Sequence, residues 1–310
     1  MFKQLKEVFN LSDKIQQFPN DGESNQNGFE LAAYGSTDKG FMRDKNEDSF
    51  LLLDLNDSRH PLGDHGADLE CLMAVAEGSE HSKRGQIASE LAIDILRTSS
   101  YLPNVKTPIE RLVSSVEIAN QRIFDHAEHD FSLKGMAATM AAVYVKGTTV
   151  YVAYPGNLRP HVVRNGTMIQ LAKVQTLAQI LEKIGIERRS EISRSAYKAL
   201  TQAVGPEPSA DIWQSCFELM PNDTLLICTA GLTSEIPEQD LVRIINENIA
   251  IPKSAVRRLI WQATLSSGEE NITVIVAQFR DSAARYNRLS HEKAVAGSPD
   301  CDVLPEYRAA

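Results

Sequence analysis

The stretch at residues 141–172, "AAVYVKGTTVYVAYPGNLRPHVVRNGTMIQLA", is the clearest structural signal in the chain. It consists of successive β-rich runs joined at Lys146-Gly147, Pro155-Gly156 and Asn165-Gly166. Asn-Gly suits a two-residue hairpin, because both central positions of such a turn require a positive φ. The stretch therefore predicts an antiparallel meander.

The segments on either side of this stretch carry the 3.6-residue periodicity of amphipathic helices. Helices are expected at 84–99 and 108–129, the second with Pro108 in its first turn. Further helices are predicted at 173–184, 190–203, 238–248 and 253–266, and further strands at 211–219, 224–229 and 271–279. Hairpin-joined strands with helices bunched between them favour an α+β fold, in which helices cover antiparallel sheets. They argue against a doubly wound parallel sheet.

The predicted domain organisation has three parts. Residues 1–28 are expected to form a short amphipathic helix followed by the polar, turn-rich linker "NDGESNQNG". Residues 29–280 are expected to form one domain. Residues 281–310 show little periodicity and predict a mobile tail.

Composition and charge exclude several classes of protein. The 310 residues carry a net charge of −9 without a dense Lys/Arg cluster, so a nucleic-acid-binding protein is not expected. The longest apolar run, 136–145, is too short to span a bilayer. The four cysteines form no CxxC pair, which favours reduced thiols and a cytoplasmic location.

Four short stretches that border expected strands carry the residues capable of chemistry. Each one alone is typical of a solvated turn. In chain order they are "GSTDKGFMRDKNEDSFLL" (35–52), "MAVAEGSEHSKRGQIAS" (73–89), "ICTAGLTSE" (227–235) and "SSGEENITVIVA" (266–277).

Together these stretches resemble, in the same order, the motifs of the type 2C (PPM) metal-dependent serine/threonine protein phosphatases. "GMAATM" (135–140) and "LTQAVGPEP" (200–208) add to the resemblance, which runs from about Ala33 to Phe279. It implies two packed antiparallel β-sheets flanked by helices, an α-β-β-α sandwich. It also implies hydrolysis of phosphoesters by water that bridges two divalent metals.

Some metal-site positions of this family keep an oxygen ligand in this sequence. The resemblance places the phosphate-binding arginine at Arg43 and an acid beside the metals at Asp48. It places metal ligands at Glu47, Glu77, Gly78 and Glu270. At two of these positions, 77 and 270, the family has Asp. The longer Glu moves its carboxylate oxygens by about 1.5 Å.

Other ligand positions have lost their carboxylate. The family's acids fall here at Asn157, Ala230 and Ser234, and the loop at 78–82 lacks the family's Gly-Met-Gly-Gly-His. The sequence therefore predicts a pseudophosphatase with a degenerate metal site and no intact catalytic set. No cofactor is expected beyond one weakly held Mn²⁺ or Mg²⁺.

Such a protein would act by protein–protein binding in signalling. The expected partner is a phosphoprotein, a kinase or an active phosphatase. A variable flap at 173–199 offers a possible docking helix through Leu177, Ile180, Leu181 and Ile184.

Two other functions remain open from the sequence. The first is a weak Mn²⁺- or Mg²⁺-dependent serine/threonine phosphatase with an incomplete metal centre. The second is an enzyme of another kind that binds zinc through His126 and His129, although no third ligand is apparent there. His81, beside Glu77 and Glu80, could form a different metal site.

Overall fold

The computed structural model describes residues 15–17, 29–55, 69–79, 84–99, 107–156, 158–171 and 203–281. The described strands form two sheets in which every pair of neighbours is antiparallel. The six-stranded sheet has the order β1 (Ile15–Gln17), β2 (Phe29–Asp38), β11 (Ile272–Asp281), β10 (Thr224–Cys228), β7 (His161–Arg164) and β8 (Thr167–Gln170). The five-stranded sheet has the order β3 (Asp48–Asp54), β4 (Glu70–Gly78), β5 (Ala138–Lys146), β6 (Thr149–Tyr154) and β9 (Trp213–Glu218).

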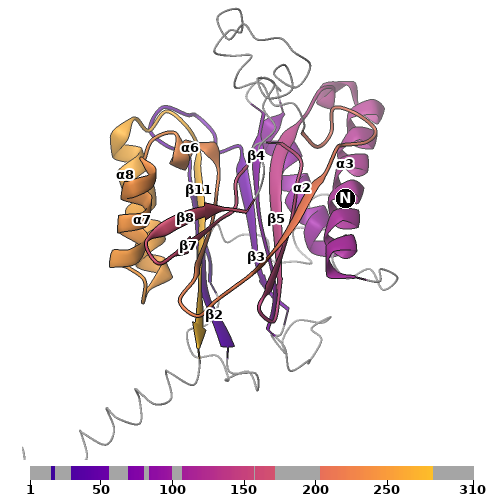
Figure 1. Ribbon diagram of the computed structural model, residues 1–310. Coiled ribbons are helices and arrows are strands. Elements are labelled where there is room, and N and C mark those ends of the chain that lie inside the picture. The colour runs from indigo at the N-terminus through magenta and orange to yellow at the C-terminus, as the bar shows by residue number, and fades with distance from the viewer. Residues whose placement is uncertain are drawn as a thin grey trace, which may run out of the picture.

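Helices cover the outer face of each sheet, which gives four layers (Figure 1). Helices α2 (Gly85–Ser99) and α3 (Pro108–His129) pack on the five-stranded sheet, and the short 3₁₀ helix η1 (Phe131–Leu133) follows α3. Helices α6 (Ala230–Thr233), α7 (Glu238–Glu247) and α8 (Pro252–Ser266) lie on the side of the six-stranded sheet. The predicted α-β-β-α sandwich is confirmed.

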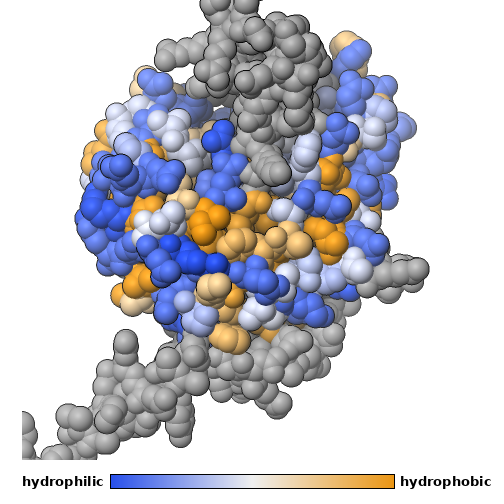
Figure 2. Space-filling view, viewed as in Figure 1, coloured by the Kyte–Doolittle hydropathy of each residue, from blue (hydrophilic) through white to orange (hydrophobic). Residues whose placement is uncertain are grey.

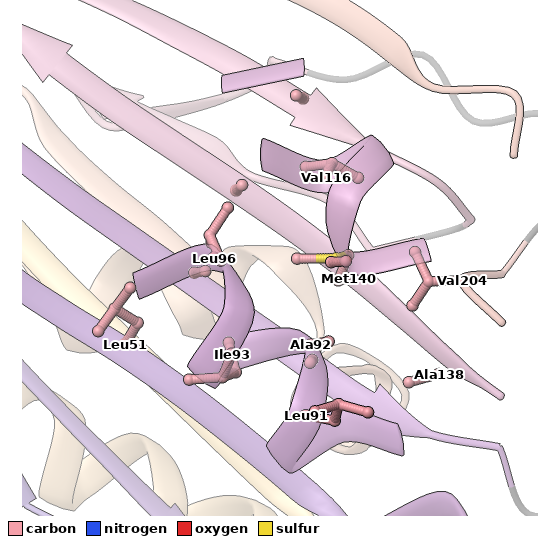
Figure 3. Packing of buried hydrophobic residues seen from close by; sticks show 14 of the residues in the cluster. Leu51, Leu91, Ala92, Ile93, Leu96, Val116, Ala138, Met140 and Val204 are labelled. Carbon is pink, nitrogen blue, oxygen red and sulfur yellow. The ribbon is translucent and has the colours of Figure 1, made fainter. Parts of the chain in front are cut away.

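The alternation of side chains along each central strand supplies two cores at once. In β4, Cys71, Met73 and Val75 point between the two sheets, while Leu72 and Ala74 point toward the helices. Because both faces are covered, the strand is apolar at nearly every position. Ala92 of α2 and Ala138 of β5 both belong to the core between this sheet and its helices (Figure 3).

Hydrophilic and apolar side chains are also separated on the outer surface. In the view of Figure 2 the helical layers at left and right are mainly hydrophilic, and apolar side chains gather between them, where β7 and β8 cross the front of the molecule. Among the described helices, none combines the length and apolar character that a bilayer crossing requires.

The predicted meander is wrong at one junction. The turns after Lys146 and at Asn165-Gly166 are hairpins, and both residues of the second have positive φ, 51° and 76°. At Pro155-Gly156, however, the chain leaves the five-stranded sheet and enters the six-stranded one. A Pro-Gly turn marks a change of direction, but the sheet that receives the next strand is decided by packing.

One predicted segment differs from the structure, and several others lie outside the described residues. Residues 15–17, expected within the helix and linker, form β1 and pair with Tyr34–Ser36 at the edge of β2, whose backbone groups need partners. The helices expected at 173–184 and within 190–203, the flap with its docking helix, and the tail beyond 281 lie outside the described residues.

We predict that the core between the sheets is the main source of stability. Met73 has no exposed surface there, so Met73→Ala should lower the free energy of unfolding by about 2–5 kcal/mol. The measurement is urea denaturation followed by circular dichroism. Met220→Ala makes the same change at an exposed position and is the matched control. Equal effects of the two substitutions would contradict this description of the core.

Candidate active site

Four chain segments meet at the end of the sandwich near α6 (Figure 1). They are the start of β3, the end of β4, the end of β10 and the start of β11. The antiparallel register places Asp48 directly opposite Glu77, and Glu77 directly opposite Thr139 on β5. These segments belong to the four stretches in which the sequence predicts the residues that carry out chemistry.

The alternation along the strands fixes the direction of both carboxylates. Asp48 has the same parity as Phe50 in β3, and Glu77 has the same parity as Val75 in β4. Phe50 and Val75 belong to the core between the sheets, so Asp48 and Glu77 also point between the sheets, at the mouth of the sandwich. Thr139 on the neighbouring strand is fully buried and points the same way.

Asp48 joins the two sheets through hydrogen bonds. Its Oδ2 accepts from the hydroxyl of Thr229, at 2.9 Å, and from the hydroxyl of Thr273, at 2.7 Å. Thr229 follows β10 and Thr273 lies in β11, whereas Asp48 begins β3. Burial raises the pKa of Asp48 to about 6, against the opposing effect of the two threonine donors.

Glu77 is the more perturbed of the two acids. Burial, and after it the negative charge of Asp48, raise its pKa to about 8. The backbone N–H of Ala230 is a hydrogen-bond donor to Glu77 and opposes this rise. Where the resemblance expects a ligand carboxylate at position 230, the chain thus provides a backbone amide.

Arg43 is held by a neighbouring loop. Its Nη2 donates to Glu270 Oε2 at 2.7 Å, and its Nε donates to the carbonyl oxygen of Glu269 at 2.8 Å. The same two loops are tied by Asn271, whose amide donates to the carbonyl oxygens of Lys39 and Lys45, both at 2.9 Å. Arg43 and Glu270 are therefore brought together by a cross-linked pair of loops.

A close backbone contact places Ala230 beside the start of β11. A Cβ on Gly231 would lie 2.1 Å from the carbonyl oxygen of Asn271, a distance at which backbone would have to move. Only glycine fits this approach. Asn271 in turn accepts from the backbone N–H of Glu47, at 2.9 Å. Position 230 and the two acids Glu47 and Glu270 are thus linked through one residue.

The structure brings together most of the predicted site residues. These are Arg43, Glu47, Asp48, Glu77, Gly78, Ala230 and Glu270. Ser234 is exposed and one turn further on, at the end of α6, and its backbone N–H donates to the carbonyl oxygen of Ala230. Asn157 lies outside the described residues, as does His81.

The sequence reasoning missed the role of two threonines. Both lie inside the quoted stretches at 227–235 and 266–277, but the sequence assigns neither of them a role. A hydroxyl at the end of one strand and another inside a buried strand were the available signals, but their common partner, Asp48, is distant in sequence by 181 and 225 residues.

The oxygen donors of this site fit one hard cation better than two. Carboxylates and carbonyls are the ligands that Mn²⁺ and Mg²⁺ prefer. Burial first, and repulsion between neighbouring acids second, raise the pKa values of Asp48 and Glu77, and a bound cation would favour the ionised form of both. A pair of ions lacks the ligand at Ala230. Within the part of the chain that the structure describes, no three acidic, histidine or cysteine side chains are already arranged as a metal cluster, at this site or at His126 and His129.

We predict an unusual pH dependence of stability. A carboxyl whose folded-state pKa lies above its unfolded value of 4.5 binds more protons in the folded state, so stability falls as pH rises from about 4.5 to 8. Glu77→Gln removes this loss. In EDTA, the difference in the free energy of unfolding between the variant and the wild type should grow by about 1–2 kcal/mol in favour of the variant from pH 5 to pH 8.

Urea unfolding at the two pH values measures this gain. Glu117→Gln, at an exposed position on α3, is the matched control. A gain for Glu77→Gln that is the same at both pH values would contradict the assignment.

Comparison with known proteins gives a consistent relationship. No protein-family model matches the chain. The serine/threonine phosphatase stp of Listeria innocua is 27% identical over 250 residues, which cover 78% of this chain and 93% of the relative. The PPM Ser-Thr phosphatase MsPP from Mycobacterium smegmatis, solved with cacodylate, superposes with a TM-score of 0.63 at 27% identity over 79% of this chain and 97% of that one.

A third protein is solved with its metals. The catalytic domain of serine/threonine protein phosphatase PstP, in complex with two manganese ions, superposes with a TM-score of 0.63 at 24% identity and covers 82% of this chain and 100% of that one. Relatives in sequence and neighbours in structure thus agree with each other, and they support placing the chain in the PPM-type (type 2C) serine/threonine phosphatase family.

Proposed function

We propose that the protein is a metal-dependent serine/threonine phosphatase of low activity, acting on phosphoproteins with an incomplete metal centre. The observation that carries the proposal is the convergence of Asp48 and Glu77 at the mouth of the sandwich, with Arg43 and two further acids around them. The related enzymes named as serine/threonine phosphatases support this function over an inactive one.

The oxygen atoms at the site are sufficient to bind a single cation in this proposal. Glu47, Glu77 and the Gly78 carbonyl would hold it, with Asp48 beside them. A divalent cation supplies positive charge that stabilises the phosphoryl oxygens and acidifies water. The expectation that no cofactor is used finds no support, because PstP is bound to two manganese ions.

The chain's own residues have defined tasks in this proposal. Arg43 binds the phosphoryl group through its planar guanidinium. The hydroxyls of Thr229 and Thr273 hold Asp48 in one orientation. The raised pKa of Glu77 means that a cation competes with a proton for this carboxyl, so the reaction should be faster at pH 8 than at pH 6.

A second candidate function rests on a different observation. Ala230 provides no carboxylate, and its amide turns to Glu77 instead. A chain that seats no cation would be a pseudophosphatase, which regulates a phosphorylation pathway by binding a phosphoprotein, a kinase or an active phosphatase. Even where Glu77 carries a proton, the acids Glu47, Asp48 and Glu270 would then outnumber Arg43 at the site, which favours docking of a protein surface over tight phosphate capture.

We predict low but real turnover of a phosphopeptide at saturating Mn²⁺. EDTA and Glu47→Ala should each abolish it, because each removes the cation. The triple variant Ala230→Asp, Glu77→Asp, Glu270→Asp restores the shorter acids and the missing carboxylate, so its turnover should rise on the order of 10²-fold. The measurement is phosphate release with wild type and variants side by side.

Glu117→Asp shortens an exposed acid on α3 in the same way and is the matched control. No turnover by the wild type, together with turnover by the triple variant, would reject the low-activity phosphatase and favour the binding protein. A thermal shift gives an independent reading, since a cation that binds the folded state raises the melting temperature by mass action.

A further inference from the structure

The residue expected to hold phosphate is already paired. Arg43 Nη2 lies 2.7 Å from Glu270 Oε2, and the two side chains are 33% and 34% exposed. A second donor of Arg43, Nε, is used by the carbonyl oxygen of Glu269. An incoming phosphoryl group can reach this ion pair from solvent, but it would compete with the Glu270 carboxylate for Nη2.

The backbone around the pair keeps the two side chains within reach of each other. The amides of Phe41 and Met42 both donate to the carbonyl oxygen of Gly268, at 2.9 and 3.0 Å. The Asn271 amide donates to the carbonyl oxygen of Lys45 on the other side of Arg43 in the chain. Because the two loops are cross-linked on both sides of Arg43, the pair opens by rotation of side chains and not by separation of the loops.

A carboxylate and a phosphate compete for the same feature of arginine. Both accept parallel N–H bonds from the planar guanidinium, and only one of them can do so at a time. We propose that Glu270 is a built-in competitor for Arg43, so that a phosphorylated segment binds only after this ion pair has opened. The inference rests on the proposed phosphate-binding role of Arg43 and adds a positioning residue that controls access to it.

The length of the side chain is what allows the competition. An aspartate at position 270 would keep the charge but withdraw the carboxylate by about 1.5 Å, one C–C bond. From the present separation of 2.7 Å, that change breaks the hydrogen bond without altering the net charge of the site. Glu270→Asp therefore tests the hydrogen bond to Arg43 while the net charge of the site stays the same.

Binding in the absence of metal tests the proposal. Full-length wild type and Glu270→Asp are titrated with a short fluorescein-labelled phosphoserine peptide in EDTA, and anisotropy gives the affinity. Glu270→Asp should bind about two- to fivefold more tightly, the range expected for losing one solvent-exposed ion pair. The unphosphorylated peptide should show no such gain, and adding Arg43→Ala to Glu270→Asp should remove it.

Asp44→Asn is the control for charge alone. It removes an exposed carboxylate next to Arg43 in the chain and should leave the affinity as in the wild type. Equal affinities of wild type and Glu270→Asp, including undetectable binding by both, would overturn the proposal. So would an equal gain from Asp44→Asn or a gain that survives Arg43→Ala. Turnover with Mn²⁺ is measured separately. If the wild type has turnover but Glu270→Asp does not change peptide affinity, the competitor role of Glu270 is rejected and the proposed phosphatase function stands.

Discussion

The pairing of Asp48 with Glu77 is the constraint on which the rest of the site depends. Two acids directly opposite each other on neighbouring strands repel, and their common direction between two sheets removes most of the water that would screen them. The molecule offsets this in three ways: threonine hydroxyls on Asp48, a backbone amide on Glu77, and protonation of Glu77 near neutral pH. A strand register that serves only stability would not place acids here, so the pairing points to function.

The contacts that hold the loops of the site together do not depend on the side chain at position 230. The glycine at 231 allows the turn after β10 to touch the start of β11, and Asn271 links its own loop to the loop at 39–47. These contacts involve backbone atoms and survive any change at position 230.

Much of the fold was accessible from the sequence because its signals are local. The Asn165-Gly166 turn, the period of α3 and the apolar run of β10 each depend on a few neighbouring residues, and each appears in the structure within a few residues of the prediction. The crossing at Pro155-Gly156 was not accessible. Nothing in a local pattern states whether the next strand joins the same sheet or the facing one.

The sequence by itself determined the set of chemical groups: which acids remain, which are longer, and that position 230 has none. The tertiary structure alone decided how those groups interact. It set Asp48 against two threonines more than 180 residues away, and it turned Glu270 toward Arg43. The physical reason is that hydrogen bonds and ion pairs act over about 3 Å in space, whatever the separation along the chain. Composition therefore fixes which partners exist, and packing fixes which of them meet.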